Sequence, residues 1–229
     1  ADNLTVTGDF AAGNFKFGGA NFTDGLLIGH STTGTLDNAL KNTGVGIISL
    51  DALTSGDANT AVGYSAGTAI NSGASNTLIG NYAGLATSTA SFNTGVGYLS
   101  LGSATGGSNT AVGANANYRN ASGSYNTSIG DSALEGVASN NHSYDTALGA
   151  KALELLTTGD YNIGIGYLAG DNITSGDGNV IIGSVDAASA TGDRQLMITG
   201  YDGSTTTTWI SGDNSGNVTM PADLTIGDD

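Results

Sequence analysis

NTAVGYSA, residues 59–66, contains the five-residue word that decides the fold, because this word returns along most of the chain. It reads Asn-Thr-small-(Val/Ile)-Gly. Copies begin at Gly25 (as GLLIG), Asn42, Asn59, Asn76, Asn93, Asn109, Asn126, Asp145, Asn162 and Asn179. The start positions of successive copies differ by 17, except for one interval of 16 and one of 19. Fixed self-similarity of this kind indicates a solenoid.

Two columns of the repeat are nearly invariant. The opening asparagines are Asn42, Asn59, Asn76, Asn93, Asn109, Asn126, Asn162 and Asn179. The closing glycines are Gly29, Gly46, Gly63, Gly80, Gly97, Gly113, Gly130, Gly149, Gly166 and Gly183. A repeat this short cannot hold a pair of helices, which needs more than about thirty residues. The repeat predicts an all-β fold, a parallel β-roll or β-solenoid of about ten coils, each with two short strands and two turns.

Alternation within the word predicts which side chains point inward. Its second and fourth residues share one face, and its first, third and fifth share the other. We expect the Val/Ile column to fill a thin interior with the Thr column beside it. The Asn, small and Gly positions would then form a flat outer face. A second strand follows the Gly, as at residues 64–66, and Gly56 and Gly73 are expected to take a positive φ at a corner.

The two ends of the chain depart from the repeat, which predicts three domains. Residues 1–24 form an N-terminal β connector, residues 25–186 the repeat domain, and residues 187–229 a C-terminal β connector. Strands are expected at residues 4–7, 14–17, 195–199, 205–211 and 217–220. The opening ADNLTVTGD and the closing ADLTIGD resemble one another, so we interpret the ends as connectors between successive segments of a longer shaft.

Composition excludes several classes of protein. The chain of 229 residues carries a formal net charge of -15 with only five Lys and Arg, and it has no Cys. So few basic residues cannot neutralise a phosphate backbone, which argues against a nucleic-acid partner. Disulfide scaffolds and thiolate metal sites need Cys. No apolar run approaches the roughly 18 residues of a membrane span, so no membrane insertion is expected.

Few residues suggest chemistry. His30, His142, Glu135 and Glu154 form no catalytic arrangement in sequence, so the chain is predicted not to be an enzyme and to have no catalytic, cofactor or metal site. We interpret the Asn column as a side-chain amide ladder that satisfies turn backbone, with a ligand comb as the alternative. The Thr column suggests ice binding as an alternative function, since flat Thr arrays occur on ice-binding solenoids. The acidic corner residues are expected to cap turns; they are Asp57, Asp160 and Asp177.

Tyr125, Tyr144 and Tyr161 each stand directly before the word, in a column that also holds Phe92. They form a candidate surface aromatic ladder. Three roles stay open from the sequence. The rings can stack on one another, pack between chains, or stack on the sugars of a host surface.

The burial expected for a single chain leaves a thin margin of stability. About four modest apolar side chains per coil contribute about 1.5–3 kcal/mol each. Ordering the backbone costs about 1–2 kcal/mol per residue. A flat face can pack against another copy of the chain, so we expect a homotrimer with closed cyclic symmetry.

NTAVG at Asn59 and Asn109 and NTSIG at Asn126 resemble the head repeats of YadA-type trimeric autotransporter adhesins. That resemblance implies a parallel β-roll, three of which pack about one axis. The family's repeats run a little shorter than those of this chain and often carry Val where this chain has Thr. The NTAVGYSA-like array also resembles tracts in bacteriophage tail fibres, as does the closing TWISGDNSGNVTMPADLTIG.

These resemblances imply a structural and adhesive function, first of all that of a phage tail fibre in host attachment. The alternatives are a bacterial trimeric adhesin head, a polysaccharide-cleaving tailspike and an ice-binding solenoid. The expected partners are two further copies of the chain, neighbouring fibre segments and a host cell-surface glycan or protein. The expected location is the virion, or the extracellular space and cell surface.

Overall fold

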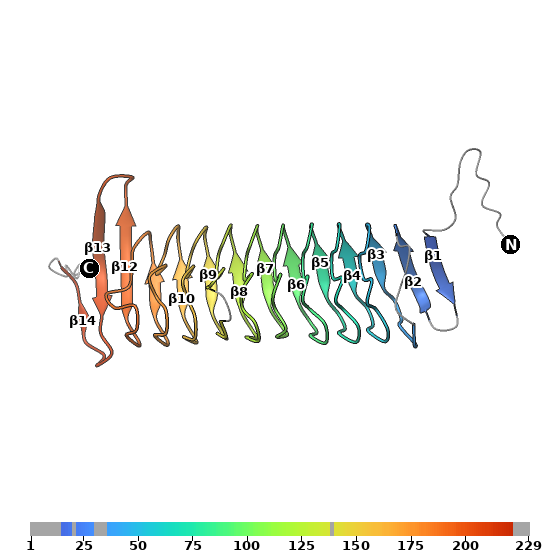
Figure 1. Cartoon of the computed structure of the whole chain (residues 1–229). Helices are drawn as coiled ribbons and strands as arrows, with labels where there is room; N and C mark the ends of the chain where they lie inside the picture. Colours follow the sequence, from blue (N-terminus) through green and yellow to red (C-terminus); the bar gives the residue numbers. More distant parts are fainter. Residues whose placement is uncertain (1–14, 20–21, 30–35, 138–139, 222–229) are drawn as a thin grey trace, which may run out of the picture.

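The molecule is a long, narrow stack of short β-strands. The computed structural model describes residues 15–19, 22–29, 36–137 and 140–221, and this part contains strands and turns but no helix. All strands belong to one 14-stranded sheet in which order in space follows order in sequence. Figure 1 shows β1 at one end of the stack and β14 at the other. The prediction of an all-β parallel solenoid is confirmed, and equivalent residues of most successive turns are 17 residues apart, as at Asn42 and Asn59.

Each turn contributes one strand of three residues, formed by the middle of the word. These strands are β3 (Thr43–Val45), β4 (Thr60–Val62), β5 (Thr77–Ile79), β6 (Thr94–Val96), β7 (Thr110–Val112), β8 (Thr127–Ile129), β9 (Thr146–Leu148), β10 (Ile163–Ile165) and β11 (Val180–Ile182). Neighbouring strands are parallel and in register, so that Thr94 pairs with Thr110 and Thr127 with Thr146. The two irregular intervals of the repeat are therefore absorbed outside the sheet.

An antiparallel hairpin begins the stack. Strand β1 (Phe15–Gly19) is antiparallel to β2 (Phe22–Ile28), and β2 is parallel to β3, with Leu26 opposite Thr43. The degenerate copy at Gly25 is therefore a true turn of the repeat. The predicted strand at residues 14–17 is found as β1, whereas the one predicted at residues 4–7 lies outside the described residues.

Antiparallel strands also end the stack. Strand β12 (Leu196–Tyr201) is parallel to β11 and antiparallel to β13 (Thr206–Gly212), which pairs with β14 (Val218–Thr219). The three strands predicted in this region are confirmed. Gln195 here occupies the Asn position of the word, so β12 adds a further copy that the sequence pattern had missed. Hairpins at both ends limit the open edges that a parallel stack would otherwise present.

The predicted inside and outside of the word were inverted. Asn59 and Ala61 are fully buried, whereas Thr60 and Val62 are partly exposed. The other copies follow the same rule, so the Val/Ile column points outward and the Asn column inward. Alternation gave the correct period but the wrong phase. The physical reason is that the narrow interior accepts the small third residue, and the Asn side chain is buried because its polar atoms are hydrogen-bonded there.

The segment after the closing Gly is not a regular strand. Ser65 and Gly67 have φ values of 54° and 57°, so left-handed residues alternate with right-handed ones. Hydrogen bonds still join the turns, for example from Ser65 N to Ile47 O at 3.0 Å. The left-handed residue near each corner is the one before the word, such as Ala58, and not Gly56 as expected. Gly56 is needed for space, because a Cβ there would overlap the carbonyl oxygen of Gly73.

Large and small side chains alternate across the interior. Where the third residue of the word is Gly95, the opposite wall supplies Leu101, and a Cβ on Gly95 would lie 3.2 Å from Leu101 Cδ1. Where it is Leu78, the opposite wall supplies Gly84, and a Cβ there would lie 2.5 Å from Leu78 Cδ1. One or two large side chains fill each turn of the narrow coil, as Leu50 and Leu53 do together in one turn, because native cores leave few voids.

Candidate functional site

The outward side of the parallel strands is the most extensive candidate surface. We call it the outer band and define it by four columns, which are the Thr and Val/Ile columns of β3–β11, the residue before each word and the residue after its closing Gly. The column before the word is Lys41, Ala58, Ser75, Phe92, Ser108, Tyr125, Tyr144, Tyr161 and Gly178. The column after the Gly is Ile47, Tyr64, Asn81, Tyr98, Ala114, Asp131, Ala150, Tyr167 and Ser184.

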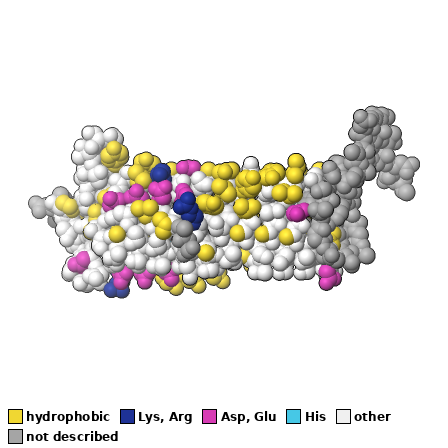
Figure 2. All heavy atoms as spheres, viewed as in Figure 1, with side chains coloured by type: hydrophobic (Ala, Val, Ile, Leu, Met, Phe, Trp, Pro, Cys, Tyr) yellow, Lys and Arg dark blue, Asp and Glu magenta, His cyan; other side chains and the backbone are white. Residues whose placement is uncertain are grey.

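Exposed apolar side chains gather on this outer band. Between residues 41 and 184 the exposed large hydrophobic residues are Ile47, Tyr64, Ile79, Phe92, Tyr98, Val112, Tyr125, Ile129, Val137, Tyr144, Leu148, Leu155, Tyr161, Ile163 and Tyr167. All except Val137 and Leu155 belong to the outer band. Its only charged residues are Lys41 and Asp131. Figure 2 shows the stack from one side, with hydrophobic side chains along its upper edge and Lys, Arg, Asp and Glu side chains gathered toward the C-terminal half. A contiguous apolar surface on so acidic a chain is typical of an interaction site.

The Asn column forms an internal ladder. Asn59 donates from its backbone N to Asn42 Oδ1 at 2.9 Å, and from Nδ2 to Asn42 Oδ1 at 3.1 Å and to Gly73 O at 2.8 Å. Asn76 repeats the arrangement one turn further on. These side chains are buried and hydrogen-bonded to one another, so they are not available as a ligand comb. Their role in this geometry is to join successive turns.

Asp145 interrupts the ladder, and His142 compensates for it. Asp145 Oδ1 accepts from Asn162 N at 2.7 Å, while Oδ2 lies 3.0 Å from His142 Nδ1. Both side chains are fully buried. Burial raises the pKa of Asp145, and the His142 hydrogen bond and charge oppose that rise. The sequence did not reveal this pair, although the His lies within the longest interval of the repeat, which ends at the Asp.

The acidic corner residues bind turn backbone. Asp57 Oδ1 accepts from Leu40 N at 2.7 Å, Asp160 Oδ1 accepts from Ser143 N at 2.7 Å, and Asp177 Oδ1 accepts from Asp160 N at 2.8 Å. Each therefore caps the corner of the preceding turn. In the described part of the chain, no group of three or more His, Cys, Asp or Glu is placed to hold a metal ion.

The three tyrosines before the word stack face to face. The ring centroids of Tyr125 and Tyr144 are 5.2 Å apart and those of Tyr144 and Tyr161 are 4.9 Å apart, with interplanar angles of 3°. All three rings are exposed, Tyr161 by 60%. Of the roles left open by the sequence, stacking on one another is present in the single chain. The outer ring faces and all the ring edges stay accessible.

A second aromatic group borders the other side of the outer band. Tyr64 and Tyr82 meet edge to face with centroids 5.4 Å apart, and Tyr82 and Tyr98 do so at 6.4 Å. Tyr64 and Tyr98 are both exposed. Aromatic side chains therefore border the Thr and Val/Ile columns on both sides.

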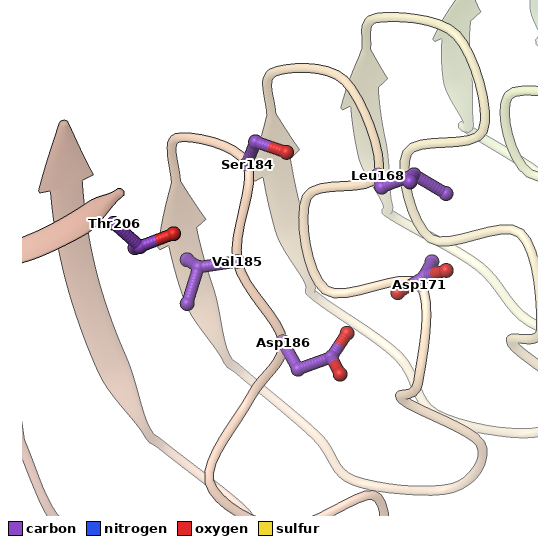
Figure 3. A pocket seen from close by; sticks show the side chains of 6 residues that line it. All are labelled: Leu168, Asp171, Ser184, Val185, Asp186 and Thr206. Carbon is purple, nitrogen blue, oxygen red and sulfur yellow. The ribbon is translucent and has the colours of Figure 1, made fainter. Parts of the chain in front are cut away.

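A hollow near the C-terminal end brings two carboxyl groups together. It has a volume of about 470 Å³ and is lined by Leu168, Asp171, Ser184, Val185, Asp186 and Thr206. Figure 3 shows the Asp171 and Asp186 side chains pointing toward one another. Burial, followed by the hydrogen bond and charge of Asp186, raises the pKa of Asp171 to about 6.

The remaining candidates from the sequence are two glutamates and two histidines. Glu135 pairs with Arg119 at 3.7 Å, and Glu154 accepts from Lys151 Nζ at 2.9 Å. His142 is buried against Asp145, and His30 lies outside the described residues. Glu135 and Glu154 lie in neighbouring turns, where Gly136 N donates to Glu154 O at 2.8 Å, and each carboxylate has a basic partner, whereas His142 lies in the interior.

No helix in the described part is long and apolar enough to cross a membrane. No protein-family model, curated protein or solved structure matches this chain.

Proposed function

We propose that this chain is a segment of a homotrimeric fibre that attaches a particle to a host surface, and that the fibre is a phage tail fibre. The observation that carries the proposal is the exposed, almost uncharged outer band. The repeat's resemblance to adhesin heads and phage fibres points in the same direction.

The size of the outer band supports association with further copies. Nine turns stacked at about 4.8 Å and a width of about six residues at 3.3 Å give a surface of roughly 40 by 20 Å. That is about 800 Å², the area that one partner buries in an interface of standard size. The unburied Val/Ile column supplies the apolar contact that the thin interior of one chain lacks.

The elongated shape supports a fibre. The first and last described strands lie at opposite ends of the stack (Figure 1), so a preceding and a following segment would continue along the same axis. The cross-turn hydrogen bonds of the sheet and of the Asn ladder run along that axis. They make the stack suited to bear a pull between its two ends.

Sedimentation equilibrium tests the trimer. The expected mass is about three times the 22.5 kDa of one chain. Ile129→Lys, in the outer band, is expected to dissociate the trimer because it buries an unpaired charge. Leu155→Lys is the matched control, since Leu155 is exposed by 43% and Ile129 by 40%, but Leu155 lies outside the band. A monomeric wild-type protein would refute the assembly.

Attachment is tested by incubating labelled protein with a panel of bacterial cells. We expect the wild type to bind to some of these strains, and Ile129→Lys to bind at least tenfold less because it loses multivalency. Equal binding by the monomeric variant would show that assembly does not serve attachment.

A further inference from the structure

We propose that the gap at Gly178, between the side chains of Tyr161 and Arg194, is a binding site for one ring of a neutral glycan. We call it the Gly178 slot; it lies at one edge and at the C-terminal end of the outer band, and in the proposed trimer this corner lies outside the contact between copies. The inference rests on the proposed attachment function and names the site and the class of ligand that attachment would use.

Tyr161, Gly178 and Arg194 occupy equivalent positions in three successive turns. Their φ values are 62°, 66° and 51°. Their backbone N–H groups make equivalent bonds to the preceding turn, as from Gly178 N to Asp160 O at 2.9 Å and from Arg194 N to Asp177 O at 2.7 Å. The three residues therefore belong to one column, and Gly178 is the position where that column lacks a side chain.

The missing side chain leaves one aromatic face open. Tyr144 covers one face of the Tyr161 ring, with the centroids 4.9 Å apart. The other face is directed toward Gly178. Turns are spaced by about 4.8 Å, so Tyr161 and Arg194 stand about 10 Å apart, which leaves room for one ring between them. The only atom within 4 Å of a Cβ placed on Gly178 would be Arg194 Cγ, at 3.6 Å.

The backbone does not require tyrosine in this column. A left-handed φ is unfavourable for a bulky residue and unrestricted for glycine. Tyr125, Tyr144 and Tyr161 nevertheless adopt it at 62°, 63° and 62°. Stacking among them offsets part of that strain. The outermost ring is stacked on one side only, so its free face is the part of the ladder that is still available to a ligand.

Polar groups stand beside the slot. Arg194 is exposed, and among the described residues its guanidinium forms no ion pair and does not lie over an aromatic ring. Asp193 Oδ1 accepts from Asp177 N at 3.0 Å, and Asp177 Oδ1 accepts from Asp160 N at 2.8 Å. The second oxygen of each carboxylate can accept a further hydrogen bond.

This combination fits a neutral sugar ring. A pyranose presents an apolar C–H face, which packs on an aromatic ring, and hydroxyl groups at its edge, which bond to guanidinium and carboxylate groups. An anionic sugar would meet Asp160, Asp177 and Asp193 on a chain of net charge -15. A nucleobase would bring a phosphate backbone that the same charges repel.

The test uses the assembled protein and an array of neutral oligosaccharides of glucose, galactose, mannose and N-acetylhexosamines, with affinities then measured by calorimetry. We expect the wild type to bind at least one of them. Gly178→Tyr fills the slot and continues the stack, so it should weaken binding at least tenfold, while the strain of a left-handed tyrosine, partly offset by stacking, should lower the melting temperature by only a few degrees. Tyr161→Ala and Arg194→Ala should each weaken binding. Tyr201→Ala, which removes an exposed tyrosine outside the outer band, is the matched control.

Two results overturn the inference. One is that no neutral oligosaccharide binds, and the other is that Gly178→Tyr binds as tightly as the wild type. Cell attachment separates this failure from failure of the proposed function. Gly178→Tyr protein that still attaches to bacteria shows that the slot is not the attachment site, whereas wild-type protein that attaches to none refutes the attachment function itself.

Discussion

The interior of the stack changes character along its length. From Leu27 to Ala116 the buried side chains form one apolar cluster, and a second apolar cluster begins at Ala133. Between and beside them lies a polar section, which we define by its buried side chains. These are Asn117, Asn120, Asn140, His142 and Asp145. The sheet is the same in the apolar and polar sections, because β7, β8 and β9 stay parallel and in register along the polar section.

The comparison shows that coil geometry and core stability have separate origins. Inter-turn backbone bonds and the Asn ladder set the coil in both sections. In the polar section Asn117 Nδ2 and Oδ1, Asn140 Oδ1 and His142 Nε2 have no hydrogen-bond partner among the described residues, compared with Asn71 Oδ1 and Thr87 Oγ1 in the rest of the described part. Unpaired buried polar atoms are destabilising. We therefore expect the polar section to be the least stable part of the interior. Two variants in this section test that difference, and a third tests the hollow near the C-terminal end.

The largest effect is expected from His142→Ala. It removes the donor that faces the buried Asp145 carboxylate, and at pH 7 we expect a loss of about 3 kcal/mol in unfolding free energy. The loss should be smaller at pH 5. His142 lowers the pKa of Asp145, so without it the carboxyl group takes up a proton more readily. Urea unfolding at fixed protein concentration measures the loss.

The double variant His142→Ala/Asp145→Asn is the matched control. It restores the Asn found at this position in the other turns, so it should recover most of the loss. Equal destabilisation of the single and double variants would mean that His142 acts by packing and not as a partner of Asp145.

A smaller effect of opposite sign is expected from Asn117→Leu. Other turns carry Leu at this position with nearly the same backbone, since φ is 49° at Asn117 and 55° at Leu101. Removing two unpaired buried polar atoms should stabilise the protein by about 1–2 kcal/mol, measured by urea unfolding. The reverse change, Leu101→Asn, should destabilise it. A stability loss in Asn117→Leu would show that the polar section is satisfied by groups such as buried water.

The smallest effect is expected from Asp171→Asn in the hollow of Figure 3. The pKa of Asp171 is raised from 3.8 to about 6, so the folded state holds this proton more tightly than the unfolded state. Its contribution to stability is therefore present below pH 3.8 and is lost as the pH rises to about 6. Asn imitates the protonated form. The melting temperature of the variant should therefore be about 1–2 °C above that of the wild type at pH 7, and the two melting temperatures should be the same at pH 4. The same difference in melting temperature at pH 7 and pH 4 would contradict the view that Asp171 is held protonated in the folded state.

Much of the fold could be predicted from the sequence because a solenoid repeats one local arrangement. The word fixed the strands, their order and their spacing, and it located the Tyr ladder. The sequence could not show the His142–Asp145 pair, because a two-residue insertion changes how the turn folds. It also missed the copy at β12, where Gln195 replaces Asn and Thr199 replaces the closing Gly.

By itself, the sequence determined that this protein is a parallel β-solenoid, because only a repeated backbone ladder places Gly and Asn at the same point in nearly every coil. It predicted two short strands per turn, and the structure has one. The tertiary structure decided which columns face outward. Alternation along a strand shows which residues share a face but not which of the two faces is buried, so the word is compatible with either orientation. The width of the coil decided between the two faces, since each turn of the interior holds only one or two large side chains together with an Asn whose polar atoms are paired with the neighbouring turns. The Val/Ile column was left outside, and the outer band results from that choice.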